Sequence, residues 1–241
     1  MSAADKMTSP SAAPSQVVAW LAGATGLVGR AVLDRLLARP EVAQVSAIVR
    51  RPLGRPPSPK LRELVVDFDR MEDTLRGQTA THVFCCLGTT IAVAGSEDAF
   101  RRVDHDYPVA LGRAAHAGGA RRYLVVTALG ADPRSRIFYN RVKGEVERDL
   151  GALALPELHL FRPSLMVGER AESRRGERLA AAVAVPLGAL LVGPLRKFRP
   201  IAGADVAEAM VRVALDDPAP ARRPAVVVHE SHAIAARAAA R

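Results

Sequence analysis

The sequence predicts an α/β fold, in which a doubly wound parallel β-sheet carries helices on both faces. Apolar runs with the length of buried strands alternate with longer segments of helical spacing along most of the chain. These runs contain few charged residues, as is typical of strands buried on both faces. A glycine-rich stretch joins the first run to the first helical segment, and right-handed crossovers then wind the sheet in both directions.

The first half of the chain supplies four of the predicted strands. Residues 17–23 (VVAWLAG) form a short apolar run that ends in glycine. Residues 27–39 follow as an amphipathic helix, which Pro40 ends. A proline-rich loop occupies residues 51–60. Beyond the first run, strands are predicted at residues 45–49, 61–68 and 81–88.

The second half continues the alternation of strands and helices. A helix is predicted from about residue 96 to residue 116, with Ser96 as its N-cap and two carboxylates, Glu97 and Asp98, in its first turn. Residues 203–217 form an amphipathic helix. The other elements predicted here are a strand at residues 121–129, a helix at 136–153 and strands at 157–163 and 224–230.

A single domain is predicted from residue 17 to residue 241, because a chain of 241 residues with 49% hydrophobic content can bury one large core. Residues 1–16 lack the apolar core of a secretory signal, and we expect a disordered leader there. Substrate-side elements are expected around residues 165–200. The apolar stretch at 178–193 is interrupted by Pro186 and is too short to span a bilayer, which favours a buried lid or a subunit contact.

Composition narrows the functional classes. The net charge of +9 comes from arginines spread along the whole chain, and only 4% of residues are aromatic, too few for a platform on which bases stack. Nucleic acid is therefore a distant third possibility. Cys85 and Cys86 are adjacent, so their side chains point to opposite faces of a strand, which disfavours a disulfide and indicates a reducing, cytoplasmic setting. No spaced Cys/His cluster predicts a metal site.

The glycine-rich stretch GATGLVG, residues 23–29, has the spacing G-x-x-G-x-x-G between the first strand and the first helix. The first glycine permits a tight turn, the second lets the backbone approach a pyrophosphate, and the third lets the helix pack closely on the strand. The free N–H groups at the start of the helix favour anions. The stretch therefore predicts dinucleotide binding and a Rossmann fold, with a flexible turn as the alternative.

Two consecutive arginines, Arg50 and Arg51, end the second predicted strand. In NAD-binding folds an acidic residue near this place accepts hydrogen bonds from the ribose 2′-hydroxyl, but here no carboxylate occurs until Glu63. Two guanidinium groups suit a 2′-phosphate, one through bidentate bonds and one through stacking on adenine. The arginines therefore favour NADP(H), unless they are ordinary solvated residues of an arginine-rich chain.

Seven stretches occur in the order seen in the short-chain dehydrogenases/reductases: GATGLVG, VRRP, VDFD, CCLGTT, TALGAD, YNRVKGEVE and FRPSLMVGER. The chain resembles more narrowly the atypical branch typified by the Tat-interacting-protein oxidoreductases, from about residue 17 to residue 233. The resemblance implies seven parallel strands and NADPH as cofactor. It implies cofactor contacts from Gly23, Ala24, Thr25, Gly26, Leu27, Val28, Gly29, Arg50, Arg51, Leu87, Gly88, Thr89, Tyr139, Lys143, Met166 and Arg174, with Asp67 near the adenine.

Tyr139 and Lys143 form a Y-x-x-x-K pair, and residues at i and i+4 of a helix share a face. An ammonium ~4 Å from a phenol favours the phenolate by up to about 4 kcal/mol at an effective dielectric of ~20. Tyr139 can then exchange the proton of a carbonyl or hydroxyl oxygen while nicotinamide exchanges hydride. Lys143 is one of only four lysines in the chain, which adds weight to the pair. The alternative is a surface pair without function.

The third catalytic position departs from the family pattern. A Ser or Thr at the end of the fifth strand commonly hydrogen-bonds the substrate oxygen, and Thr127 is the candidate here. Many relatives have two serines at this place, and Ala128 replaces the second. The departure leaves open whether this donor is present.

Two functions therefore stay open from the sequence. The first is an NADP(H)-dependent oxidoreductase that acts on a carbonyl or hydroxyl of a small molecule, with a lipophilic wall expected from residues 169–199. The second is an NADP(H)-binding regulator or redox sensor, which the Thr127–Ala128 departure favours. Tyr139 and Lys143 favour the enzyme. The sequence does not identify the substrate, and it leaves a homo-oligomer open.

Overall fold

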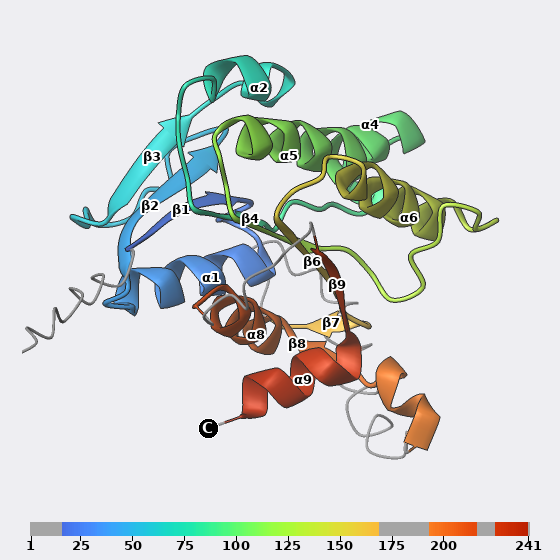
Figure 1. Ribbon diagram of the computed structural model, residues 1–241. Helices are drawn as coiled ribbons and strands as arrows, with labels where there is room; N and C mark the ends of the chain where they lie inside the picture. Colours follow the sequence, from blue (N-terminus) through green and yellow to red (C-terminus); the bar gives the residue numbers. More distant parts are fainter. Residues whose placement is uncertain (1–15, 169–192, 216–224, 241) are drawn as a thin grey trace, which may run out of the picture.

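The computed structural model describes residues 16–168, 193–215 and 225–240 (Figure 1). Seven parallel strands form one sheet in the order β3-β2-β1-β4-β5-β6-β9. From β1 the chain first runs outward to β3 and then returns to β4 and continues the other way, which confirms the doubly wound sheet. The strands are β1 (Val17–Ala22), β2 (Val42–Val49), β3 (Leu61–Val65), β4 (His82–Cys85), β5 (Arg122–Val126), β6 (Glu157–Arg162) and β9 (Ala225–Glu230).

Helices cover both faces of this sheet (Figure 1). One face carries α1 (Leu27–Ala38), α8 (Gly203–Leu215) and α9 (Ser231–Ala239). The opposite face carries α2 (Met71–Thr74), α4 (Glu97–Arg101), α5 (Tyr107–Ala117) and α6 (Phe138–Gly151). Shorter elements are α3 (Ile91–Ala94), η1 (Phe68–Arg70), η3 (Gly193–Phe198) and the two-residue strands β7 (Met166–Val167) and β8 (Ile201–Ala202), which pair with each other.

Each face of the sheet has its own hydrophobic core. Neighbouring residues of β1 enter different cores: Leu21 packs with the α1 and α8 side, and Trp20 packs with the α2, α5 and α6 side. Both side chains are at most 1% exposed. Because alternate residues of a strand point to opposite faces, a strand buried on both sides must be apolar at every position. This explains the uninterrupted run in the sequence.

The helix predicted at residues 96–116 is divided into three consecutive segments. Ser96 is the N-cap, as predicted, and its hydroxyl accepts a hydrogen bond of 3.1 Å from the Ala99 amide. The middle segment, η2 (Arg102–Asp106), is π-helical. A π-helical turn accommodates an extra residue and shifts the side chains that follow it around the helix axis. The 3.6-residue period therefore does not continue from α4 into α5.

Other predicted boundaries differ by a few residues. The third strand ends at Val65 rather than at residue 68, because Asp67 caps η1 and its carboxylate accepts a hydrogen bond of 3.0 Å from the Asp69 amide. The predicted leader at residues 1–16, the apolar stretch at 178–193 and the end of the helix at 203–217 lie largely or wholly outside the described residues. No helix in the described ranges combines the length and the apolar character needed to cross a bilayer.

Candidate cofactor and catalytic site

The glycine loop lies between β1 and α1, packed against the end of β4. Gly23 has φ +87°, and a Cβ there would lie 2.4 Å from the carbonyl oxygen of Cys86. A Cβ at Gly29 would lie 2.0 Å from the carbonyl oxygen of Gly23, so helix and loop approach each other as closely as backbones can. Two of the three glycines are therefore required by the backbone itself.

Gly26 differs from its two neighbours in the motif. It is exposed, and an added Cβ would come no nearer than 3.4 Å to the protein, at the carbonyl oxygen of Gly23. It is also the N-cap of α1, where no side chain caps the helix and no acidic residue occupies the first turn. Amide donors at this end are thus open to an anion, and the cradle fits the pyrophosphate of a dinucleotide.

Arg50 and Arg51 follow β2 directly and are exposed. Neither guanidinium forms an ion pair with a carboxylate of the described residues, whereas Arg55 nearby pairs with Asp34 at 2.8 Å. Glu63, the first carboxylate after the two arginines, accepts a hydrogen bond of 2.8 Å from the Leu53 amide. The Glu63 carboxylate thus binds the proline-rich loop and does not pair with Arg50 or Arg51. The region beyond β2 therefore carries unpaired positive charge, as a 2′-phosphate would require.

Two of the three residues predicted for catalysis, Tyr139 and Lys143, lie on α6. Tyr139 is in the first turn, half-buried, with its ring 5.7 Å from the ring of Phe100 at an angle of 48°. Lys143, one turn later, is 5% exposed. Its ammonium nitrogen lies 2.7 Å from Oδ1 of Asp104, a residue of η2 that is 1% exposed. The Tyr–Lys pair is thus accompanied by a buried carboxylate.

The loop that follows β4 contacts the Lys143–Asp104 pair. Oδ2 of Asp104 accepts a hydrogen bond of 2.8 Å from the Thr89 amide, in the loop that follows β4. A Cβ added to Gly88 in that loop would lie 3.5 Å from Oδ1 of Asp104. Burial is the largest single influence and lowers the pKa of Lys143, but the attraction of Asp104, its hydrogen bond and the smaller effects of Tyr139 and Cys85 together outweigh burial, and the pKa is raised. Lys143 is therefore a permanent cation at neutral pH.

Asp104 is not among the site residues that the sequence predicts. The only signal was a carboxylate four residues after Phe100, on what would be the apolar side of the predicted helix at 96–116. The π-helical turn hides this signal, because it changes which residues of α4, η2 and α5 share a face.

Thr127 does not have the surroundings expected of a substrate donor. It is 2% exposed, and its hydroxyl lies 2.6 Å from Oε1 of Glu147 and 3.2 Å from the carbonyl oxygen of Phe161. A hydroxyl has one proton to donate, and both of these partners are acceptors. The side chain is thus engaged inside the protein, and the catalytic role expected for it stays a prediction. Ala128, the other candidate position, has no donor.

Glu147 connects Thr127 to the end of β6. Its carboxylate is also bound by the Arg162 guanidinium, through Nε at 3.0 Å and a second nitrogen at 2.5 Å. Tyr139, Lys143 and Glu147 recur every four residues, so they share one stripe of α6 that faces the sheet. A Cβ at Gly144 would lie 2.1 Å from the Pro133 nitrogen, so α6 also touches the loop before it.

The remaining predicted contacts are distributed around these groups. Leu87 and Thr89 lie in the loop that Asp104 binds, and Asp67 is exposed at the start of η1. Met166 is in β7, partly buried against the core on the α1 side. Arg174 lies outside the described residues. Burial raises the pKa of both thiols, Cys85 and Cys86, which leaves them protonated at neutral pH.

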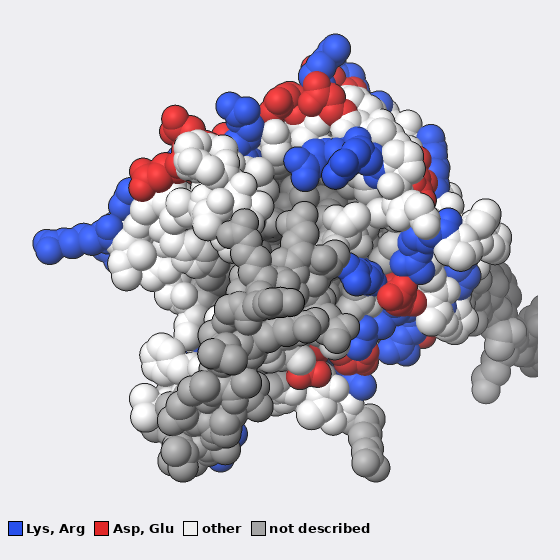
Figure 2. Space-filling view, turned by 180° about the vertical axis from the view of Figure 1, so that it is seen from behind, with Lys and Arg blue, Asp and Glu red and all other residues white. Residues whose placement is uncertain are grey.

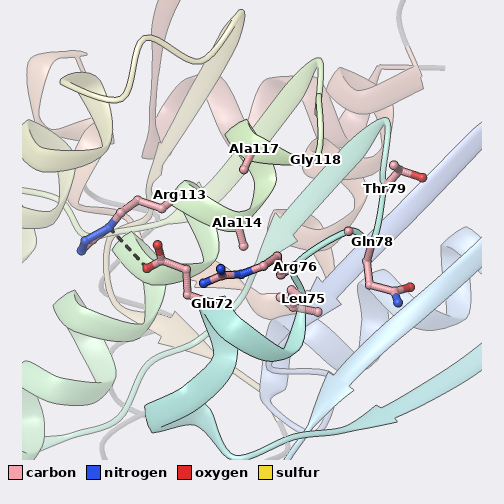
Figure 3. Close-up of a pocket in the computed structure, with 10 residues that line it drawn as sticks. Glu72, Leu75, Arg76, Gln78, Thr79, Arg113, Ala114, Ala117 and Gly118 are labelled. Carbon is pink, nitrogen blue, oxygen red and sulfur yellow. Dashed lines mark ion pairs between the residues drawn. The ribbon is translucent and has the colours of Figure 1, made fainter.

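A separate pocket of about 370 Å³ lies between α2, α5 and the segment before β4 (Figure 3). Arg113 and Glu72 pair across it at 3.6 Å, and Arg76 pairs with Asp73 at 2.7 Å. Gln78 and Thr79 in its wall precede β4, so the pocket lies toward the amino end of this strand. It is thus distinct from the glycine loop, which meets the carboxyl end.

Among the described residues on the face shown in Figure 2, Lys and Arg side chains lie in several separate groups, and some adjoin acidic side chains. A protein that binds nucleic acid through its phosphates commonly concentrates Lys and Arg on one surface.

Comparison with known proteins agrees with the geometry of the glycine loop. The profile of a family described as NAD(P)H-binding matches residues 23–152. The protein fmp52, mitochondrial, of Emericella nidulans is 35% identical over 174 residues, which cover 70% of this chain and 75% of that protein. The protein HTATIP2 of Rattus norvegicus is 37% identical over 164 residues, 67% of each chain.

Solved structures share the fold at low sequence identity. MoeE5 in complex with UDP-glucose and NAD superposes with a TM-score of 0.62 at 19% identity, covering 87% of this chain and 74% of that one. WbmF of Bordetella bronchiseptica in complex with NAD+ gives 0.64 at 14%, covering 93% and 78%. The expectation of a cytoplasmic setting is contradicted by the names of the relatives, since the Fmp52 proteins are designated mitochondrial.

Proposed function

Because the chain belongs to the NAD(P)H-binding family and is a relative of the HTATIP2 and Fmp52 proteins, we propose that it is an NADP(H)-dependent oxidoreductase that acts on a carbonyl or hydroxyl group of a small molecule. The observation that carries the proposal is the stripe on α6, where half-buried Tyr139 lies one turn before the buried ammonium of Lys143. Through Asp104, this pair contacts the loop after β4 at Thr89. Cys86, directly after β4, also contacts the glycine loop at Gly23.

Each residue of the pair has a role in the proposed reaction. Bound NADP(H) supplies or accepts the hydride. Tyr139 gives its phenolic proton to the carbonyl oxygen during reduction, or accepts the hydroxyl proton during oxidation. Lys143 stabilises the developing phenolate and donates hydrogen bonds to the nicotinamide ribose. Thr127 acts through Glu147 as a positioning residue for α6, with no contact to the substrate.

Replacing Tyr139 with Phe tests the enzymatic role. The ring keeps its contact with Phe100, so the fold should change little. Turnover of a carbonyl compound, found by screening for NADPH consumption, should fall about 10²- to 10⁴-fold. NADPH affinity should change by less than about 1.5 kcal/mol, the contribution of one hydrogen bond. A variant that turns the substrate over at the wild-type rate would refute the mechanism.

The preference for NADP(H) over NAD(H) rests on Arg50 and Arg51, both exposed and without a carboxylate partner among the described residues. We expect NADPH to bind at least about tenfold more tightly than NADH in calorimetric titrations, which is about 1.4 kcal/mol. Replacing both arginines with alanine should weaken NADPH by about 1.5–3 kcal/mol for each charged hydrogen bond lost and leave NADH nearly unchanged.

A matched control comes from Arg76 and Arg113 at the pocket of Figure 3. Replacing both with alanine removes the same charge from another part of the surface and should leave both affinities unchanged. If the Arg50/Arg51 variant weakens NADH as much as NADPH, the arginines support the loop and do not read the phosphate.

A second candidate function is an NADP(H)-binding regulator with little catalysis. It is favoured by the buried, engaged hydroxyl of Thr127 and by the absence of a donor at Ala128. Tight NADPH binding that raises the melting temperature, together with no turnover across a broad carbonyl screen, would favour this function over the enzyme.

A further inference from the structure

We propose that Asp104 is a positioning residue for the nicotinamide half of the cofactor: its carboxylate ties the Lys143 ammonium to the loop after β4 and so preforms the polar surface on which that half binds. The inference deepens the proposed function and rests on it. Asp104 contacts neither cofactor nor substrate in this scheme, because it acts through Lys143 and through the Thr89 amide.

The order of the strands indicates which half of a dinucleotide would lie near Asp104. A dinucleotide crosses the carboxyl edge of a doubly wound sheet where the strand order reverses, which is here between β1 and β4. Arg50 and Arg51, directly after β2, lie on one side of this point and mark the adenosine half. The loop after β4 lies on the other side and touches the glycine loop, since a Cβ at Gly23 would lie 2.4 Å from the carbonyl oxygen of Cys86. The nicotinamide half would therefore extend over β4, toward Asp104.

Asp104 connects two separate parts of that surface. Its Oδ1 lies 2.7 Å from the ammonium nitrogen of Lys143 on α6, and its Oδ2 accepts a hydrogen bond of 2.8 Å from the Thr89 amide. The backbone of the loop lies directly against the pair, because a Cβ added to Gly88 would lie 3.5 Å from Oδ1 and 4.0 Å from the ammonium nitrogen. One carboxylate thus fixes how α6 and the loop after β4 lie relative to each other.

The ammonium of Lys143 keeps hydrogen-bond donors for a ligand. An ammonium has three N–H donors, and among the residues that the structure describes only Asp104 forms an ion pair or hydrogen bond with Lys143. Both side chains are buried, and a buried cation that loses its counter-ion is strongly unfavourable. Asp104 therefore holds the ammonium in place and leaves its other donors available to the hydroxyl groups of the nicotinamide ribose.

The segment that carries Asp104 is itself attached to α6. His105, the next residue of η2, lies 2.9 Å from a carboxylate oxygen of Asp149, and Arg101, at the end of α4, pairs with Glu145. Both partners are residues of α6. The carboxylate of Asp104 therefore stays opposite the ammonium before any ligand binds, and binding of the cofactor does not have to order this part of the site.

The test compares the binding of two nucleotides to the full chain by calorimetric titration. NADPH contains both halves of the cofactor, whereas adenosine 2′,5′-bisphosphate contains the adenosine half alone. Asp104→Asn removes the charge that holds Lys143 and keeps a side chain of nearly the same size. We expect NADPH to bind at least about tenfold more weakly to this variant, and the bisphosphate to bind within about twofold of the wild type. Equal weakening of both nucleotides means a merely structural role and overturns the proposal, as does unchanged binding of NADPH.

Two further variants calibrate the comparison. Asp106→Asn is the matched control: Asp106 lies in the same η2 segment but is exposed, and both affinities should stay at the wild-type value. A loss as large as that of Asp104→Asn would overturn the proposal. Replacing Arg50 and Arg51 with alanine should weaken both nucleotides, because both carry the 2′-phosphate. If this variant weakens NADPH alone, the two halves of the cofactor lie elsewhere and the inference is wrong.

The double variant Asp104→Asn/Lys143→Gln covers the case in which Asp104→Asn does not fold, because it leaves no unpaired buried charge. It should lose as much NADPH affinity as Asp104→Asn, since Asp104 acts through Lys143, and it should bind the bisphosphate as the wild type does. Wild-type affinity for NADPH, or a loss of both nucleotides, overturns the proposal. A wild-type protein that binds neither nucleotide would instead refute the proposed function and the inference with it. None of these titrations needs a substrate, so they are separate from the carbonyl screen.

Discussion

Helices α6 and α8 lie on opposite faces of one sheet and are attached to it by different means. The inner side of α8 is apolar, with Val206, Ala207 and Met210 fully buried, and its carboxylate Glu208 pairs at the outer flank with Arg35 at 2.8 Å. The inner stripe of α6 instead buries Lys143 and Glu147, each paired with an opposite charge. Apolar contacts hold α8 without fixing individual atoms, whereas directional bonds fix the side chains of α6.

The difference has a physical consequence for the two faces. An apolar interface tolerates small shifts, because the hydrophobic effect depends on area and not on direction. A buried ion pair loses much of its energy when its atoms separate, and a lone buried charge destabilises the fold strongly. The face that must hold Tyr139 in place is thus the one built from hydrogen bonds and charges.

The largest effect is expected from Glu147→Ala. The substitution removes the buried carboxylate that Arg162 and Thr127 share. Arg162 keeps only the more distant carboxylate of Glu230 at 3.4 Å, and Thr127 keeps only the carbonyl oxygen of Phe161 at 3.2 Å. The free energy of unfolding should fall by about 3–5 kcal/mol, measured by denaturant titration. Glu145→Ala, on the same helix but paired with partly exposed Arg101, is the control and should have a much smaller effect. Equal losses would mean that burial of the charge is unimportant.

A comparable substitution on the apolar face is Met210→Ala. The side chain is fully buried in the core between α1 and α8, and its removal leaves a cavity. Stability should fall by about 2–5 kcal/mol. The turnover rate of the folded variant should stay at the wild-type value, because no directional contact of α6 is changed. A change in that rate would show that the two faces are coupled and would break the comparison.

Acidification should lower the stability of the protein through His82, which lies near the end of α8. Burial lowers the pKa of His82, whose surroundings include the carbonyl group of Ala214 at the end of α8, from 6.5 to about 4. Between these values the unfolded chain binds a proton that the folded chain does not, so stability falls as pH decreases from about 6.5 toward 4. The loss should be on the order of 1–3 kcal/mol. In His82→Gln the pH dependence of unfolding should be less steep; an unchanged slope would exclude His82 as the cause.

The smallest effect is expected for the outer charges of α8. Arg35→Ala removes an ion pair with Glu208 in which both side chains are partly exposed. Such pairs contribute about 0–1 kcal/mol, and Glu208 keeps Arg212 at 2.6 Å. Thermal unfolding should therefore change by only a degree or two. A loss as large as that of Glu147→Ala would mean that exposed and buried pairs are equivalent here.

The sequence predicted α8 better than it predicted α6 and its surroundings. Strands, the glycine loop and α8 follow from apolar periodicity and turn residues, which are local properties of the chain. Asp104 and Glu147 owe their burial to partners 39 and 15 residues away, which no local pattern contains. The hydroxyl of Thr127 likewise has its acceptor, Glu147, on α6, and this contact is recognisable only once α6 is packed on the sheet.

Gly144 is a position at which close backbone packing should exclude every other amino acid. A mutation there to any other amino acid would drive a side chain into the backbone at Asp132 and Pro133, although Gly144 takes no part in the proposed chemistry. Gly151, on the same helix, has open space around its Cβ position. In a library of all single substitutions, position 144 should be depleted nearly as strongly as Tyr139, whereas position 151 should accept many residues. Substitutions at position 144 are thus excluded because the backbone at Asp132 and Pro133 lies too close to α6. A map of mutational tolerance would therefore show a strongly depleted position at Gly144.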